Sequence, residues 1–203
     1  MEKVFEVCVG NYIEAIMANK KGADRIELCD NLYDGGTTPS YGTIKKVLED
    51  VKTKVMVIIR PRGGNFEFSL EEIEIMREDI KMCKSLGAYG VVIGQLVGNK
   101  INYEITKEFT ELARPMSVTF HMAFDEVLDK DNAIEELVGL GIDRILTKGG
   151  DLSAYECMDE LKRLNEIAND RIIIMPGKGV NIENRDKILE KTGTHEIHGS
   201  KVI

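Results

Sequence analysis

The sequence lacks any apolar run long enough to cross a membrane. A membrane-spanning helix needs roughly 18–20 consecutive apolar residues, and no stretch of this chain approaches that length. The first ten residues, MEKVFEVCVG, include acidic residues and enter a strand-like pattern, unlike the basic and then apolar regions of a secretory signal. These absences predict a soluble, cytoplasmic protein with no membrane partner.

Cysteine is scarce, and positive charge does not dominate. The four cysteines of the 203 residues are expected to be reduced thiols in a cytoplasmic protein, not a disulfide framework. Lys and Arg number 27 against 35 Asp and Glu, a net charge of −8. This balance argues against nucleic acid as a partner, because phosphate binding needs a basic face. A small anionic ligand in a locally basic pocket remains compatible with it.

What the chain does have is a regular alternation of two patterns. Its length and its 43% apolar content fit a single domain over residues 1–203. Short apolar runs rich in β-branched residues alternate with longer helical patterns. The runs occupy residues 4–9, 25–28, 55–60, 90–94, 116–121, 144–147, 172–176 and 196–199. Eight strands alternating with seven helices predict a compact (β/α)8 barrel of the TIM type, with a doubly wound open sheet as the alternative.

Local signals support the helices and the repetition. Asn11 with Glu14, and Ser69 with Glu72, have the spacing of capping boxes. Glycines stand where helices are expected to end, at positions 22, 87, 141 and 193. GADRIEL at 22–28 resembles GIDRILT at 141–147, which indicates a repeated αβ unit. The chain ends four residues after the last run, without room for an eighth helix, so we expect a partner subunit to cover that gap in a homo-oligomer.

Strand side chains alternate between the two faces of a sheet. If the apolar residues of each run pack against helices, an unusually polar set points into the barrel. Its members are Glu6, Cys8, Glu27, Cys29, Arg60, Thr119, His121 and His198, with Arg62 close by. Most of them fall at the carboxyl ends of their strands, where barrel active sites lie. A buried salt-bridge network of Glu6, Glu27 and Arg60 is the structural alternative.

The successive motifs resemble those of the CutC copper homeostasis family. They include EVCVG at 6–10, GADRIELCDNL at 22–32, MVIIRPRGGNF at 56–66, VTFHMAFD at 118–125 and IIIMPGKGVN at 172–181. The similarity runs from the first strand to the last, although Lys178 stands where the family usually has a glycine. The resemblance implies a TIM-type barrel, a cytoplasmic location and a link to Cu(I).

Copper binding is the first hypothesis for function. Cu(I) prefers thiolates and accepts imidazole, and Cys8 and Cys29 end neighbouring strands. The resemblance points to the same two cysteines as Cu(I) ligands. The alternative is that both are small buried core residues, which is a common place for free cysteine.

An enzyme is the second hypothesis. Glu6, Glu27, His121 and His198 provide acid–base groups, and Arg60 and Arg62 suit a carboxylate or phosphate. Gly177, Lys178 and Gly179 follow the seventh strand, where TIM barrels often bind phosphate. These residues would suit an isomerase, lyase or hydrolase acting on a small anionic or phosphorylated metabolite, or a module that binds such a metabolite without converting it.

Overall fold

The computed structural model describes residues 2–203 and contains one sheet of eight parallel strands. In sheet order these are β10 (Glu196–His198), β1 (Val4–Val9), β2 (Arg25–Leu28), β3 (Lys54–Ile58), β4 (Gly90–Ile93), β7 (Ser117–Phe120), β8 (Arg144–Thr147) and β9 (Ile173–Pro176). The eight apolar runs of the sequence therefore become the eight strands, within one or two residues at each end. The predicted TIM-type barrel is confirmed.

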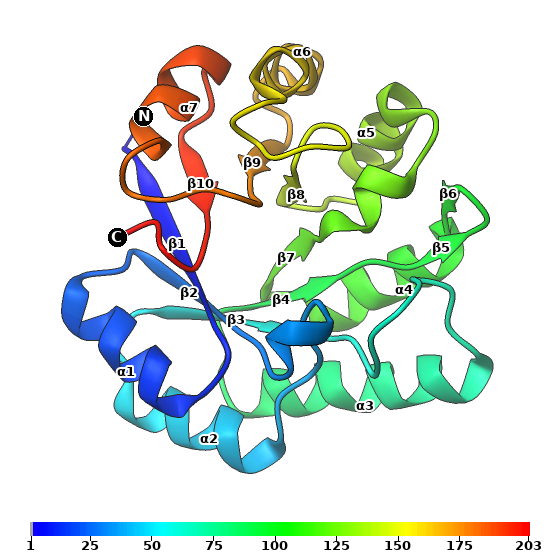
Figure 1. Ribbon diagram of the computed structural model, residues 1–203. Helices are drawn as coiled ribbons and strands as arrows, with labels where there is room; N and C mark the ends of the chain where they lie inside the picture. The colour runs from blue at the N-terminus through cyan, green and yellow to red at the C-terminus, as the bar shows by residue number, and fades with distance from the viewer. Residues whose placement is uncertain (1) are drawn as a thin grey trace.

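Within residues 2–203, seven α-helices surround the strands (Figure 1). They are α1 (Tyr12–Lys21), α2 (Tyr41–Asp50), α3 (Leu70–Ser85), α4 (Tyr103–Ala113), α5 (Lys130–Gly139), α6 (Met158–Ala168) and α7 (Arg185–Thr192). The C-terminus lies between α7 and α1, on the side of the barrel where an eighth helix would stand (Figure 1).

The ring of strands is almost closed. β10 pairs with β1 through the register Glu6↔His198, whereas β9 and β10 lie side by side without a strand pairing between residues 173–176 and 196–198. A parallel bridge between Asn181 and Lys201 joins the segments that follow these two strands. The barrel is thus closed by the loop at its carboxyl end.

The helix starts follow their capping signals, with one correction. Ser69 and Glu72 form the predicted capping box at α3. At α1, Asn11 accepts from the backbone N–H of Glu14, but the Glu14 carboxylate binds the Gly10 N–H and the Asn11 side chain. The return bond of a capping box goes one residue earlier there, to the Gly10 N–H.

Three short features within residues 2–203 were not predicted, one of them a 3-10 helix, η1 (Leu32–Asp34), after β2. A short antiparallel hairpin of β5 (Leu96–Val97) and β6 (Lys100–Ile101) turns at Gly98 and Asn99. A 3-10 helix, η2 (Met122–Glu126), follows β7. All three are too short to give a periodic signal.

The apolar side chains form two separate clusters. The larger lies between strands and helices and contains the residues predicted to face outward, among them Val7, Val9, Ile26, Leu28 and Phe120. The smaller lies inside the barrel and consists of Cys29, Met56, Ile58 and Val92, with Cys8 packed against it. Few apolar side chains therefore cluster inside the barrel, and buried polar and charged side chains occupy much of the remaining interior.

Candidate functional site

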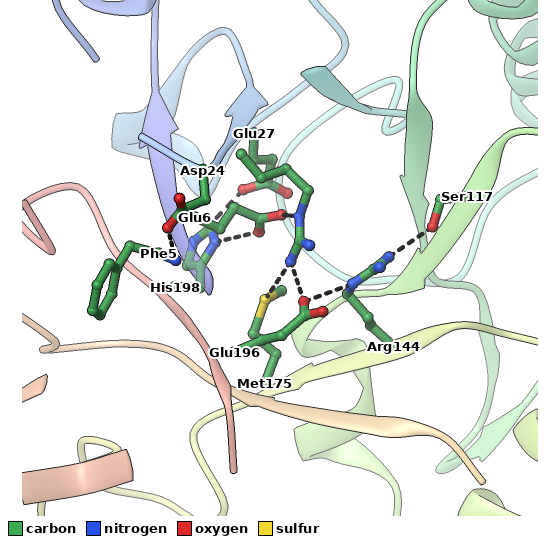
Figure 2. Close-up of polar contacts among 10 residues, drawn as sticks. Phe5, Glu6, Asp24, Glu27, Ser117, Arg144, Met175, Glu196 and His198 are labelled. Atoms are coloured by element: carbon green, nitrogen blue, oxygen red, sulfur yellow. Dashed lines mark hydrogen bonds and ion pairs between the residues drawn. The ribbon is translucent and has the colours of Figure 1, made fainter. Parts of the chain in front are cut away.

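A layer of ion pairs fills the barrel below its carboxyl end. The guanidinium of Arg25 donates to the carboxylates of Glu6 and Glu196, and Arg144 donates to Glu196 at 2.7 Å. All four side chains are buried. Figure 2 shows Glu6, Glu196, Arg144 and Met175 converging from different strands. Each buried charge has an opposite charge as partner, as a low-dielectric interior requires.

Glu6 connects this layer to the carboxyl end, which we call the mouth of the barrel. Its second oxygen lies 2.8 Å from Nδ1 of His198, its register partner on β10. Burial alone would raise the pKa of Glu6, but Arg25 and His198 outweigh it and lower the pKa to about 2. Glu6 is therefore a carboxylate that orients the His198 ring.

Cys8 and Cys29 meet at the mouth. Their sulfurs lie 4.0 Å apart, and both thiols are free. The hydrogen bond between them lowers the pKa of Cys8 well below its ordinary value, and it raises the pKa of Cys29 together with burial. Cys8 is thus the more acidic thiol of the pair.

Glu27 and His198 complete the group around Cys8. His198 Nε2 lies 3.6 Å from a Glu27 oxygen, and one ligand atom each from Cys8, Glu27 and His198 lie within 4.8 Å of one another. Burial, with Cys8 nearby, raises the pKa of Glu27 well above its ordinary value. Burial alone would lower the pKa of His198, but its contacts with Cys8 and Glu6 raise it. The pKa of Glu27 is therefore shifted upward where that of Glu6 is shifted downward.

These groups open onto a cavity of about 120 Å³. Its polar lining comes from Cys8, Glu27, Cys29, Arg60, His121 and His198, and its apolar lining includes Ile58, Phe66, Met122 and Leu146. The structure thus brings together six of the eight residues that strand alternation predicted to face inward. Glu6 lies behind His198, and Thr119 is buried with no partner for its hydroxyl among residues 2–203.

Arg60 reaches the cavity from the end of β3. Its two terminal nitrogens donate to the backbone carbonyls of Asp34, Gly36 and Gly64, at 2.7–3.1 Å. Its Nε is buried and has no partner among residues 2–203. Arg60 therefore holds the loops after β2 and β3 together, and Glu6 and Glu27 are not its salt-bridge partners.

His121 reaches the cavity from the end of β7. Its Nδ1 accepts a hydrogen bond of 3.1 Å from the Ala123 N–H, and its buried Nε2 has no partner in the described chain. Burial, reinforced by the Arg60 cation, lowers the pKa of His121 to about 3. Gly94 makes room for the ring, since a Cβ at that position would lie 2.3 Å from the His121 Cε1.

The remaining predicted anion-binding residues lie outside the cavity. The Arg62 guanidinium pairs with Glu72, its Nε–H donating at 2.6 Å. Lys178 and Gly179 line a wider groove of about 510 Å³ beside the cavity, which also touches Cys8 and His198. Gly177 lets β9 approach its neighbours, because a Cβ there would lie 2.6 Å from Leu146.

Three charged residues of the interior were not singled out from the sequence as site residues: Arg25, Arg144 and Glu196. A signal for the two arginines existed, because the repeated DRI of GADRIEL and GIDRILT places them at equivalent strand starts. Strand alternation likewise puts Arg25 on the same face as Glu27. The same alternation pointed Glu196 inward. Through their ion pairs these residues fix the position of the Glu6 carboxylate, and they do not line the cavity.

Comparisons with known proteins agree with this architecture. The CutC family model matches residues 3–203. The copper homeostasis protein cutC homolog of Homo sapiens is 46% identical over 198 residues, which cover 97% of this chain and 72% of that protein. A family protein CutC of Enterococcus faecalis is 43% identical, covering 98% of this chain and 99% of its own.

Solved structures give the same result. A crystal structure of the copper homeostasis protein CutC from Streptococcus agalactiae has a TM-score of 0.94 and 39% identity, and the match covers 99% of this chain and all of that one. An aldolase, QR15, has a TM-score of 0.73 at 16% identity over 97% of this chain and 89% of its own, a likeness of fold alone. Within residues 2–203, no helix is long and apolar enough to span a bilayer.

Proposed function

This chain belongs to the CutC family, and from that premise we propose that it binds one Cu(I) ion at the mouth of the barrel, between Cys8 and Cys29. The observation that carries the proposal is the 4.0 Å separation of the two sulfurs. Metal–thiolate bonds of about 2.3 Å, the length found for zinc, would place two sulfurs of a trigonal site about 4.0 Å apart. The donor set also suits a soft ion.

His198 is the third ligand that we propose. Its Nδ1 bonds to the Glu6 carboxylate, which leaves Nε2 facing the Cys8 and Glu27 side of the cavity. Metal-binding histidines commonly donate their other ring N–H to a carboxylate, which fixes the ring and raises its basicity. Copper would compete with a proton for Nε2 of His198, because metal ligands bind deprotonated.

The test is Cu(I) affinity, measured by competition with a chromogenic chelator on reduced protein. We expect one tight site in the wild type and its loss in the Cys8→Ser, Cys29→Ser double variant. His198→Gln should weaken it less, since both thiolates remain. Cys157→Ser is the matched control, because Cys157 is a free, half-buried thiol away from the mouth. Equal affinity of the double variant and this control would contradict the proposal.

The reduced thiols that Cu(I) requires would be maintained in the cytoplasm, where we propose that the protein works.

Acid–base catalysis is the second candidate function. It is favoured by the 3.6 Å contact between His198 and Glu27 inside one cavity, since the pKa values of both groups are raised there and titratable groups with perturbed pKa values in a cavity are candidates for acid–base catalysis. A test is exchange of carbon-bound hydrogen for deuterium in small keto acids, followed by NMR. Exchange that disappears in Glu27→Gln but persists in Cys29→Ser would support catalysis, and its absence in the wild type would argue against proton abstraction from such acids.

A further inference from the structure

Arg60 is a buried cation without a counter-ion. Its side chain is 4% exposed, yet within residues 2–203 it forms no ion pair, and Asp34 presents its backbone carbonyl to it instead of its carboxylate. The other two buried arginines, Arg25 and Arg144, both bind Glu196. Buried charges are ordinarily paired because desolvating them is costly. The carboxylates of Asp34 and Glu126 act on Arg60 only from beyond ion-pair distance, so an anion in the cavity would give Arg60 its direct partner.

Two N–H donors at this end of the cavity are also unpaired. Arg60 Nε and His121 Nε2 are both buried and have no partner among the described residues. Because Nδ1 of His121 accepts from the Ala123 N–H, the ring proton must be on Nε2. An unmade hydrogen bond at a buried donor costs about 1–3 kcal/mol, so two such donors beside one cavity indicate an absent acceptor.

Both donors flank the same ring. The Phe66 centroid lies 4.9 Å from the His121 ring centroid and 4.9 Å from the Arg60 Cζ. Phe66, Arg60 and His121 all line the 120 Å³ cavity. This half of the cavity differs from the half that holds the two thiols. A nitrogen that carries its proton, as in Arg60 Nε–H and His121 Nε2–H, cannot serve as a Cu(I) ligand.

The size and the walls of the cavity restrict the ligand. The 120 Å³ of the cavity lies below the range of roughly 300–1,000 Å³ found for pockets that bind drug-sized molecules, so it suits a ligand of only a few non-hydrogen atoms. Ile58, Leu146 and Met122 supply apolar wall. A purely polar ion such as phosphate would leave this wall without a partner, whereas the short carbon chain of an organic acid would contact it.

We infer that the cavity binds a small organic carboxylate of two to four carbons, whose oxygens accept from Arg60 Nε–H and His121 Nε2–H and whose charge balances Arg60. The site goes beyond copper binding and does not depend on it. It assigns a ligand class to the barrel mouth, and any catalysis by Glu27 and His198 would act on that class.

The experiment is calorimetric titration of metal-free, reduced protein with sodium pyruvate and sodium propionate at constant ionic strength, with inorganic phosphate as the competing chemistry. We expect saturable one-to-one binding of at least one carboxylate, tighter than phosphate. His121→Asn should weaken binding about ten-fold or more, because asparagine can still accept from the Ala123 N–H as a cap but offers no ring N–H. Arg60→Lys should weaken it similarly, since lysine keeps the charge but lacks the Nε–H.

His121→Asn separates this inference from copper binding. It should lose carboxylate affinity and retain Cu(I) affinity, because Cys8, Cys29 and His198 all remain. Absence of saturable carboxylate binding in the wild type, tighter binding of phosphate, or unchanged affinity in both Arg60→Lys and His121→Asn would each overturn the inference, whatever the copper result.

Discussion

At the scale of single residues, the barrel interior uses its three buried arginines in two ways. Arg25 and Arg144 are neutralised by carboxylates within the barrel, and Arg60 is held by backbone carbonyls alone. The first arrangement fixes structure, because every charge is matched. The second leaves a cation facing a cavity, which is the arrangement expected of a binding residue.

Removing Arg25 should be strongly destabilising. Arg25→Met leaves Glu6 and Glu196 buried without their shared cation, and breaking a buried ion pair typically costs about 3–5 kcal/mol. Urea denaturation measures the change in the free energy of unfolding. Arg163→Met is the control, since Arg163 pairs with Asp131 and Glu160 at the surface, where such pairs contribute little. Equal losses in the two variants would contradict the central role of Arg25.

His121 should make the protein sensitive to acid. Its folded pKa is about 3, below the ordinary 6.5 or so of histidine, so between these values the unfolded chain binds a proton that the folded protein does not. As the pH drops below ~6.5, the free energy of unfolding of the wild type should therefore decrease by about 1.4 kcal/mol per pH unit more than that of His121→Asn. Denaturation of both proteins from pH 8 to pH 5 tests this, and parallel curves would refute it.

At the scale of elements, strand alternation and helix capping each depend on only a few neighbouring residues of the chain. Period-two alternation placed Val7, Ile26 and Phe120 against the helices, where the structure has them. The cap at Ser69 likewise needed only the four residues of its box. Such features depend on neighbours in the chain, so they could be inferred without knowing the fold.

The capping box predicts a modest and specific effect. Ser69→Ala removes the acceptor for the Glu72 N–H and should lower the free energy of unfolding by about 1 kcal/mol. Thermal or urea denaturation measures it, and Ser69→Asp should restore most of the loss, because aspartate also caps helices. A loss that aspartate fails to rescue would show that Ser69 acts by other means.

At the scale of the whole molecule, no helix of residues 2–203 covers the side of the barrel between α7 and α1 (Figure 1). A groove of about 370 Å³ lies there, lined by Met17 of α1, Leu32 and Ile203 among others. Met17 and the adjacent Ile13 are 53% and 62% exposed. This is where the prediction of a homo-oligomer, which stays a prediction, places the partner subunit.

Sedimentation velocity tests that prediction. The wild type should sediment as an oligomer, and Met17→Glu should dissociate it, because a buried unpaired charge opposes association. Ile75→Glu is the matched control, since Ile75 is 51% exposed on α3, away from the groove. A monomeric wild type, or dissociation by Ile75→Glu as readily as by Met17→Glu, would show that this face is not the interface.

The sequence by itself determined the barrel, its strand boundaries, the inward-facing polar set and the meeting of Cys8 and Cys29, because alternation, capping and strand register are local rules. Only the tertiary structure decided which charges pair. Glu6 lies between Arg25 and His198 and not beside Arg60, and the pKa of Glu27 is raised where that of Glu6 is lowered. Those outcomes depend on distances across the barrel between residues up to 192 positions apart in sequence, which no local pattern encodes.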